Sequence, residues 1–587
     1  MRRASGETGV KLMDWNASAV VRKLFDPERG ASTRLLARWI FLRALGVIYF
    51  SAFFSLVFQV RGLIGPEGIL PAGEYLQSVS HMAGQGRFWY APTLLWLSSS
   101  NHVLLGLCWV GMLAAILVIF NIGPRWALAV CLVCFLSFVS AASEFAGYQS
   151  DGMLLEAGFL ALFLAPGGWR PGMARSHPPM LASVMLLLWE WFRIYFGSGV
   201  AKIASGDEQW RHFTAMDEYY QNGPLPTWIG WYVQHFPHWF HAGTAFGTLA
   251  LELVLVWMVF LPRRFRMVLF FIVTPWQIGI ILTANYTFLN YLVLFLGIFL
   301  LDDRFLAQFL PVRWRERSIG APSAAPAPNA APAPPGSTAP GAGAVASADA
   351  AQRVASADLS GPSAMEHAQA QTTEHSAKKT SPFSHLKIAF AAIVLVWLFY
   401  ASTVPLLGMI RPGLPFPSAP VVALEPFRIA DRYGLFAVMT RGRYEIEFQG
   451  STDGTNWVAY PFRFKPQDLA KAPGIYAPYQ PRFDWNLWFA SLGAWRENPL
   501  VPRTEVLLLR NDADVLALFA ANPFAHEPPR QVRAVLWQYW FTTPAQKRAT
   551  GAWWRREYLG LYAPVLEREA GGKFTVIQWP EAAEPRE

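Results

Sequence analysis

Long apolar runs recur along the first 410 residues of the chain and are separated by short polar loops. A run of roughly 20 hydrophobic residues is long enough to cross the hydrocarbon core of a bilayer as a helix. The pattern therefore predicts a polytopic α-helical membrane protein with about nine transmembrane helices. The predicted spans are residues 36–58, 94–120, 126–143, 151–165, 181–202, 243–261, 266–283, 286–301 and 386–408.

The charges in the loops predict an orientation for these spans. Short basic loops usually stay in the cytoplasm. The N-terminal tail and the loops around Arg125, Arg170 and Arg263 are basic, whereas the loop 203–242 carries a group of acidic residues. The alternation predicts a cytoplasmic N-terminus and an extracytoplasmic C-terminal region.

The hydrophobic pattern is interrupted after residue 310 by a segment rich in Ala and Pro. Such a composition cannot bury enough apolar surface to order itself. We expect five parts along the chain: a cytoplasmic tail (1–34), a helical membrane domain of about eight spans (35–310), a disordered cytoplasmic linker (311–385), a last transmembrane helix (386–410) and an extracytoplasmic domain (411–587).

Beyond the last span, apolar and polar residues alternate with the period of β-strands. A short turn at Asp453-Gly454 separates the first two alternating runs. Two further runs have the period of amphipathic helices. The C-terminal region is therefore predicted to be an α+β domain with a β-sandwich-like sheet. The expected strands are 444–449, 459–464 and 532–542, and the expected helices are 482–492 and 504–521.

Composition agrees with a membrane protein. The chain is 53% hydrophobic and 15% charged, whereas soluble proteins contain about 25% charged residues. The net charge of +9 comes from basic loops beside the spans and does not indicate nucleic-acid binding. Cys108, Cys131 and Cys134 all lie in apolar runs, so they are interpreted as small hydrophobic residues and not as disulfide partners or metal ligands.

Three charged residues interrupt the span 181–202, namely Glu190, Arg193 and Lys202. A charge in the middle of a bilayer costs roughly 2.5–3.5 kcal/mol, and such residues often mark a functional site. Glu190 and Arg193 are three positions apart and can pair on one helix face. Lys202 is either an anchor at the membrane surface or a site residue, and the Glu190–Arg193 pair is either structural or functional.

A second polar cluster lies between the third and fourth spans, where Ser150 or Asp151 can cap the fourth helix. Two interpretations stay open: a capped helix with Glu156 bonded to a neighbouring helix, or a polar pocket shared with Lys202 at the same membrane face. Asn285 lies in a turn between the seventh and eighth spans. The candidate pocket residues are Tyr148, Gln149, Asp151, Glu156, Glu190, Arg193, Asp207 and Asn285.

His235, His238 and His241 recur every third residue, a spacing that can place metal ligands on one helix face. Pro237 interrupts the repeat, and no Cys or closely spaced carboxylate completes a site. Interfacial side chains are the better interpretation, and we predict no metal and no cofactor. The signature motifs of the common soluble enzymes are absent from the sequence.

Several long motifs resemble the lipase maturation factor family and occur in one order along the chain. The resemblance covers nearly all of the chain outside the N-terminal tail and the linker. The motifs in the membrane part are YQSDGMLLEAGF at 148–159, FGSGVAK at 196–202, PLP at 224–226, WYVQHFP at 231–237 and ILTANYTF at 281–288. Those in the C-terminal part are YGLFAVMT at 433–440, GSTDG at 450–454, PYQPRFDW at 478–485, NPF at 522–524 and WWRRE at 553–557.

This resemblance implies a multi-pass protein that assists the folding or assembly of secreted proteins such as lipases. It implies membrane lipid and an exported client as partners, with the extracytoplasmic domain as the natural client-contacting surface. Animal members work in the endoplasmic reticulum. The Ala/Pro-rich composition of the linker looks bacterial. We therefore expect this protein in the bacterial inner membrane, with the C-terminal domain in the periplasm.

A shorter segment is similar to the one that holds the catalytic lysine of vitamin K-dependent γ-glutamyl carboxylase. It comprises Lys202, Gly206, Asp207 and Trp210. The similarity implies a second hypothesis, a membrane enzyme that acts on a lipid or quinone-like substrate with Lys202 as the base. A transporter is a weaker third hypothesis, because no inverted repeat supports it.

Overall fold

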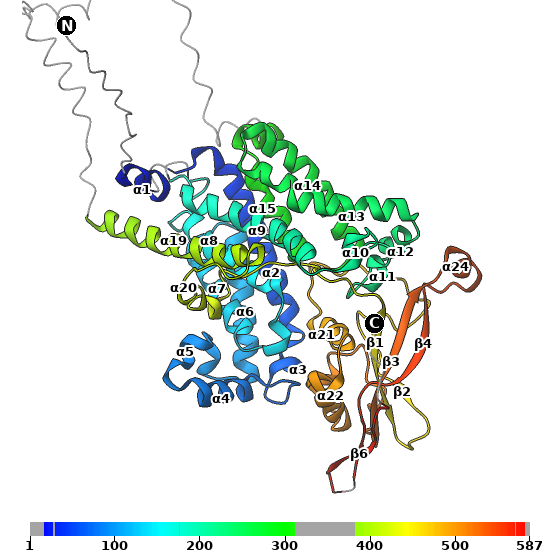
Figure 1. Ribbon diagram of the computed structural model, residues 1–587. Helices are drawn as coiled ribbons and strands as arrows, with labels where there is room; N and C mark the ends of the chain where they lie inside the picture. The colour runs from blue at the N-terminus through cyan, green and yellow to red at the C-terminus, as the bar shows by residue number, and fades with distance from the viewer. Residues whose placement is uncertain (1–16, 27–29, 175–176, 312–381, 570, 582–587) are drawn as a thin grey trace, which may run out of the picture.

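The computed structural model describes residues 17–26, 30–174, 177–311, 382–569 and 571–581. Two parts lie side by side, a bundle of helices and a C-terminal region built on an antiparallel sheet (Figure 1). The linker predicted for 311–385 and the tail predicted for 1–34 lie largely outside the described residues.

Each of the nine predicted runs is helical in the structure. Further helices lie between them or beside them along the chain. The nine are α2 (Leu35–Val57), α6 (Asn101–Ile119), α7 (Pro124–Val139), α8 (Gln149–Leu164), α9 (Leu181–Ala204), α13 (His238–Leu253), α14 (Arg263–Thr283), α15 (Leu289–Leu296) and α19 (Pro382–Ile410). The connecting helices are α1 (Ala17–Phe25), α3 (Val60–Ile64), α4 (Ala72–Ala83), α5 (Arg87–Tyr90), α10 (Glu208–Arg211), α11 (Tyr219–Asn222), α12 (Trp228–Gln234), α16 (Asp303–Leu306) and α20 (Ala419–Val422).

Length and hydropathy identify five helices among the described residues that can cross a membrane: Ser32–Val57, Asn101–Ile119, His238–Phe260, Arg263–Thr283 and His385–Ile410. Two shorter apolar helices, Pro124–Val139 and Leu289–Leu300, accompany them. The chain is therefore a helical membrane protein, while the count of nine crossings stays a prediction.

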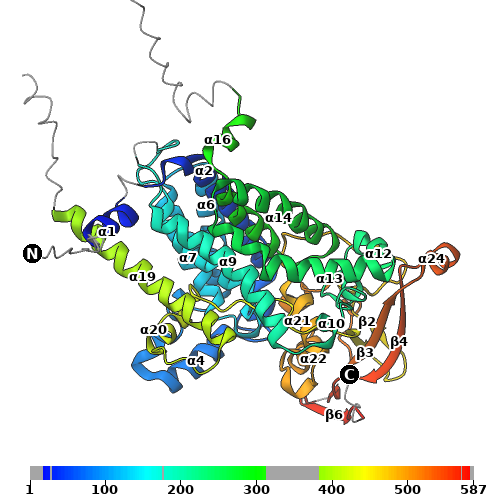
Figure 2. The ribbon, with the colours of Figure 1, turned by 45° about the horizontal axis from the view of Figure 1, so that its top comes forward.

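Helices α8 and α9 form the centre of the bundle. α2, α6 and α7 pack in sequence on one side of α8, and α13 and α19 pack on α9. Almost every side chain of α8 is buried, and the indole of Trp191 on α9 is fully enclosed. Although α19 follows the linker in sequence, it returns to lie along the bundle (Figure 2).

The C-terminal region contains one antiparallel sheet with the order β2-β1-β3-β5-β6, and β4 also pairs with β3. Ile446 of β1 lies opposite Leu536 of β3, and both side chains are buried. Helices α21 (Arg482–Ser491) and α22 (Leu500–Leu509) pack on the sheet. The strands are β1 (Arg443–Ser451), β2 (Val458–Ala459), β3 (Gln531–Phe541), β4 (Trp554–Leu561), β5 (Val565–Arg568) and β6 (Phe574–Gln578).

Three details of the predicted domain are wrong. The described residues contain one sheet packed on helices and no second sheet, so the domain is not a sandwich. The strand expected at 459–464 ends at Ala459, because Pro461 and Pro466 cannot donate to a ladder. The helix expected at 504–521 breaks at Asn511, which has a φ of 55°, and a short helix α23 (Ala513–Leu516) restarts after the capping residue Asp512.

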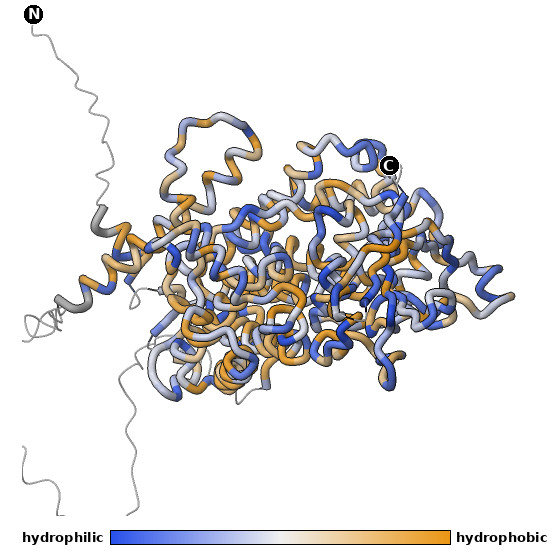
Figure 3. The backbone as a smooth tube through the Cα atoms, turned by 90° about the horizontal axis from the view of Figure 1, so that it is seen from below, coloured by the Kyte–Doolittle hydropathy of each residue, from blue (hydrophilic) through white to orange (hydrophobic). Residues whose placement is uncertain are grey.

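Hydropathy follows this division of the molecule. Hydrophobic residues predominate along the helices of the bundle, whereas hydrophilic residues gather in loops and in the outer part of the C-terminal region (Figure 3). Most buried hydrophobic residues of the two parts belong to one continuous core, and a smaller cluster around Trp231 and Trp554 also includes residues of both parts. The polar residues between the two parts are therefore enclosed by the helical bundle on one side and by the C-terminal region on the other.

Candidate functional site

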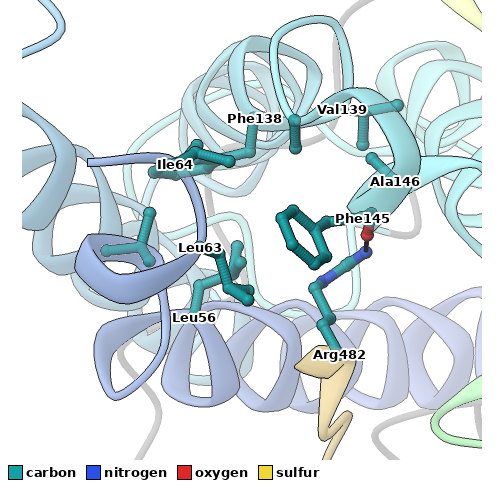
Figure 4. Close-up of a pocket in the computed structure, with 10 residues that line it drawn as sticks. Leu56, Leu63, Ile64, Phe138, Val139, Phe145, Ala146 and Arg482 are labelled. Carbon is teal, nitrogen blue, oxygen red and sulfur yellow. Dashed lines mark hydrogen bonds between the residues drawn. The ribbon is translucent and has the colours of Figure 1, made fainter. Parts of the chain in front are cut away.

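The polar residues predicted within the spans converge on the C-terminal region. Asp151, near the start of α8, forms a bidentate ion pair with Arg482 at the start of α21, with both N–O distances at 2.8 Å. The side chains of both partners are buried. Arg482 also donates to the carbonyl oxygen of Phe145, and Figure 4 shows its side chain extending toward this oxygen. This ion pair joins residues that are 331 positions apart in sequence.

One turn and a half further along α8, Glu156 forms a buried ion pair with Arg193 of α9. Tyr433 donates its hydroxyl to the other oxygen of Glu156 at 2.6 Å. Arg193 donates in turn to the carbonyl oxygen of Asp431 at 2.9 Å. Burial raises the pKa of Tyr433 well above its usual value, so this phenol stays a donor.

The predicted pairing of Glu190 with Arg193 is wrong, because Arg193 turns to Glu156 on the neighbouring helix. Glu190 is fully buried, and neither of its carboxylate oxygens has a hydrogen-bond partner among the described residues. It is the one predicted pocket residue for which the structure gives no contact with the C-terminal segments described here.

The backbone of residues 434–439 is held by three side chains from the bundle. Gly434 N–H donates to Gln149 at 3.0 Å, Leu435 N–H to Ser198 at 3.1 Å, and Met439 N–H to Asp207 at 2.6 Å. Tyr148, just before α8, packs its ring edge-on against Trp485, with the ring centroids 5.4 Å apart. The backbone N–H groups of Gly434, Leu435 and Met439 therefore fix this segment, which turns at residues 435–438, to the bundle.

Lys202, the residue proposed as an anchor or a base, has all three of its donor positions engaged. Its Nζ donates to both oxygens of Glu252 on α13 at 2.9 and 3.0 Å and to the carbonyl oxygen of Leu435 at 2.9 Å. It also lies 5.1 Å from the ring centre of Trp210. This is the environment of a charged ammonium group. A catalytic role for Lys202 stays a prediction.

Asn285 fixes a third segment of the C-terminal region. Its amide nitrogen donates to the carbonyl oxygen of Gly474 at 2.9 Å, and its amide oxygen accepts from the N–H groups of Tyr476 and Ala477. The same amide nitrogen donates to the carbonyl oxygen of Leu225 at 3.0 Å. Asn285 therefore joins a loop of the bundle to the segment that precedes α21.

The residues predicted to form one pocket belong instead to two features, a cavity beside Lys202 and a set of contacts with the C-terminal region. Asp151, Glu156 and Lys202 do not share one pocket, because each pairs with a separate partner. Lys202 and its neighbours instead border a cavity of about 550 Å³ between α9, α13, α14 and α15. The other candidate residues, except Glu190, contact the C-terminal region.

Two buried charged residues of these contacts, Glu252 and Arg443, were not identified from the sequence. Glu252 follows an apolar stretch of α13 and is the counter-ion of Lys202. Arg443 is fully buried, pairs with Glu445 and donates to the carbonyl oxygens of Gln221 and Pro224. A charge inside an apolar run is a signal for Glu252, whereas Arg443 and its neighbour resemble ordinary exposed strand residues.

Lys465 completes the cluster by pairing with Glu445 at 2.8 Å. Nearby, Asp484 of α21 accepts from the backbone N–H groups of Phe464 and Lys465. Burial raises the pKa of Asp484 to about 6, although Lys465 and the two N–H groups oppose the shift. This carboxyl group is a titratable element within the docked region.

The three histidines have separate surroundings. His235 contacts the carbonyl oxygen of Trp231, His238 contacts the carboxylate of Asp217, and His241 is buried beside Tyr220. In the part of the chain that the structure describes, no group of three or more His, Cys, Asp or Glu residues is placed to hold a metal ion.

Both parts of the chain match one family. Residues 36–308 match the lipase maturation factor transmembrane domain, and residues 429–564 match the lipase maturation factor C-terminal domain. Lipase maturation factor 1 of Bos taurus is 31% identical over 94% of this chain and 92% of its own length. The chain belongs to the lipase maturation factor family. Lipase maturation factor 2 of Gallus gallus and of Homo sapiens are each 30% identical over 90% of this chain and cover 81% and 82% of their own lengths.

No solved structure matches the chain. The two matched regions of the lipase maturation factor family contain both sides of the docking contacts. Asp151, Glu156, Arg193, Lys202 and Asn285 lie in the first region, and their partners Tyr433, Leu435, Gly474 and Arg482 lie in the second. The division of the sequence into two domains therefore separates residues that the fold brings together.

Proposed function

We propose that this protein is a membrane-embedded maturation factor that assists the folding or assembly of exported proteins, with lipases as the client class. The observation that carries the proposal is the match to lipase maturation factor 1 over 94% of this chain, which includes both parts of the fold. A maturation factor of this kind needs a rigid connection between its membrane domain and its client-contacting domain. The buried ion pairs supply such a connection.

We further propose nine membrane crossings, with the N-terminus in the cytoplasm of a bacterial cell and the domain 411–587 in the periplasm. The nine apolar helices and the alternation of basic loops support this topology. The boundaries at residues 34, 310, 385 and 410 follow the sequence prediction. Fusions of alkaline phosphatase and of green fluorescent protein after residue 420 test the proposal: the phosphatase should be active, and fluorescence from that position would contradict it.

The exposed strand β4, which pairs only with β3, is the proposed client surface. On β4, Tyr558 and Leu559 are 49% and 42% exposed, and Arg555 stacks on Trp540 of β3 with its guanidinium 4.2 Å from the ring centre. Aromatic and arginine side chains are enriched in protein interfaces. Strands β3 and β4 carry both kinds of side chain here.

The test of the function is a deletion followed by complementation. Loss of the protein should lower the activity of exported lipase per molecule of lipase, while the amount synthesised stays the same. Wild-type protein should restore it, and a Tyr558→Ala/Leu559→Ala variant should restore it only in part. Full specific activity of every exported hydrolase in the deletion strain would contradict the proposal.

The geometry does not favour the enzyme hypothesis, because Lys202 is engaged by Glu252 and Leu435. A Lys202→Arg substitution separates the two hypotheses. Arginine keeps the positive charge but cannot act as a base at ordinary pH. The maturation hypothesis expects the variant to support lipase maturation, and an inactive variant that is still folded would favour the enzyme.

A further inference from the structure

The cavity of about 550 Å³ beside Lys202 is not explained by the docking contacts. Its walls come from α9, α13, α14 and α15, with Phe436 and Met439 closing one side. The volume falls in the range of about 300–1,000 Å³ that is typical of small-molecule sites. Most of the side chains that line it are apolar or aromatic, so its occupant is predominantly hydrophobic.

The cavity is continuous with the outer surface of two candidate spans. Ile272 and Gly279 of α14 line the cavity and are exposed. On the outer sides of the two helices, Phe246 of α13 is 61% exposed and Phe271 of α14 is 55% exposed. In a membrane protein these side chains face acyl chains, so the bilayer supplies molecules directly to the opening.

A chain of polar groups ends inside the cavity with an unused donor. Tyr195 donates to Gln277 at 3.1 Å, and Gln277 donates to the amide oxygen of Asn290 at 3.0 Å. The amide nitrogen of Asn290 has no partner among the described residues, although the side chain is only 4% exposed. A buried donor without an acceptor is unfavourable, so a ligand oxygen at this position is favoured.

The Lys202–Glu252 ion pair, which also lines the cavity, limits the class of ligand. Lys202 and Glu252 neutralise each other, and all three donor positions of Lys202 are used. An anionic head group or a free carboxylate therefore has no available cation here. The amide nitrogen of Asn290 needs a neutral hydrogen-bond acceptor. The carbonyl oxygen of an ester is such an acceptor, and an ester carries no donor of its own.

We propose that this cavity binds one ester-linked acyl chain of a membrane lipid, with the ester carbonyl accepting a hydrogen bond from Asn290. The chain enters between α13 and α14. The lipid is a ligand and undergoes no reaction. The inference does not depend on the proposed function, since binding is measured without a client.

The ester can come from a phospholipid or from a neutral acylglycerol, and photolabelling distinguishes these sources. The full-length protein is placed in vesicles of phosphatidylethanolamine and phosphatidylglycerol that contain either phosphatidylcholine or diacylglycerol with a diazirine in one acyl chain. Labelling of the inner wall at Tyr195 or Val293 by either probe supports the proposal and identifies the source. Labelling of the outer residue Phe271 alone would overturn it.

Gly279 provides a substitution that fills the opening. A Cβ added there meets no atom within 4 Å, so a side chain can leave the backbone at this position without a clash, and Gly279→Trp is designed to fill the opening. Because the indole would occupy the space through which the acyl chain enters, inner-wall labelling should fall roughly tenfold. Gly243→Trp is the matched control: Gly243 is an exposed glycine on α13 with the same free space, and it does not line the cavity.

The hydrogen bond from Asn290 is tested in the wild-type protein. Unlabelled ester-linked phosphatidylcholine should compete about fivefold better than its ether-linked analogue, which lacks the carbonyl oxygen. Asn290→Leu should remove this preference. Equal competition by the two lipids in the wild type, or inner-wall labelling that Gly279→Trp leaves unchanged, would overturn the proposal.

Discussion

The Lys202–Glu252 pair illustrates how a charge persists inside the helical domain. Breaking a buried ion pair leaves the remaining charge without compensation and costs about 3–5 kcal/mol. We expect Lys202→Met to lower the free energy of unfolding by this amount, measured by denaturant titration in detergent with tryptophan fluorescence as the signal. The double variant Lys202→Met/Glu252→Gln should recover part of the loss.

Lys471→Met is the control for this experiment, since Lys471 is exposed and its loss should be nearly neutral. A Lys202→Met protein as stable as the control would show that the pair contributes nothing.

Asp484 makes stability depend on pH. Its pKa is about 6 in the folded protein and 3.8 without the fold. Between these values the folded state binds more protons than the unfolded state, so the free energy of unfolding falls as pH rises from about 4 to 6 and is constant above. The change is on the order of 2–3 kcal/mol.

The Asp484→Asn variant keeps the oxygen that accepts from Phe464 and Lys465 but cannot ionise. Comparing its pH profile of unfolding with that of the wild type isolates the contribution of this carboxyl group. The difference between the two proteins should grow from pH 4 to pH 6. Parallel profiles would mean that Asp484 does not titrate in this range.

The sequence marked the residues that are costly to bury but could not assign their partners. Asp151, Glu156 and Lys202 stand out because each interrupts or borders an apolar run. Their partners are remote, and Arg482 is 331 positions from Asp151. Arg193 shows the error that follows: its neighbour on the same helix, Glu190, was chosen, although Glu156 on the adjacent helix is its partner.

At the scale of elements, a glycine on α9 determines how closely the segment 431–439 approaches the bundle. A Cβ on Gly197 would lie 2.7 Å from the carbonyl oxygen of Tyr433, so the backbone would have to move. Overpacking of this kind costs about 1–3 kcal/mol. We expect Gly197→Ala to lower the free energy of unfolding by this amount and to increase hydrogen exchange at the amides of Gly434 and Leu435.

Gly106→Ala on α6 is the matched control, because a side chain at that helix position meets no atom within 4 Å. It should be neutral or slightly stabilising. Unchanged exchange at Gly434 in the Gly197→Ala protein would mean that the segment does not depend on this close approach.

Helices and strands could be predicted from the sequence where a single pattern, such as a long apolar run, is clear. Apolar runs located the five helices of the described residues that are long and apolar enough to cross a membrane, because hydrophobic length is a strong signal in a membrane protein. Short alternating runs were less reliable: the run at 459–464 contains Pro461, and the apolar run from 504 continues across the turn at Asn511. The sandwich was a wrong inference because strand patterns do not reveal whether helices or a second sheet cover the other face.

At the scale of the whole molecule, the two family regions form one unit. The C-terminal region is attached to α8, α9 and the loop at Asn285 through buried side chains that reach its backbone and its charges. Forces on the C-terminal sheet are therefore transmitted to the membrane-embedded helices. A factor that supports a folding client benefits from such a fixed platform.

The most direct test of this coupling is a double-mutant cycle on the Asp151–Arg482 pair, using the free energy of unfolding of the full-length protein in detergent. Asp151→Asn and Arg482→Met should each cost about 3–5 kcal/mol. If the pair joins the two parts, the double variant should cost about 2–3 kcal/mol less than the sum of the single variants. Strict additivity of the two substitutions would contradict the account.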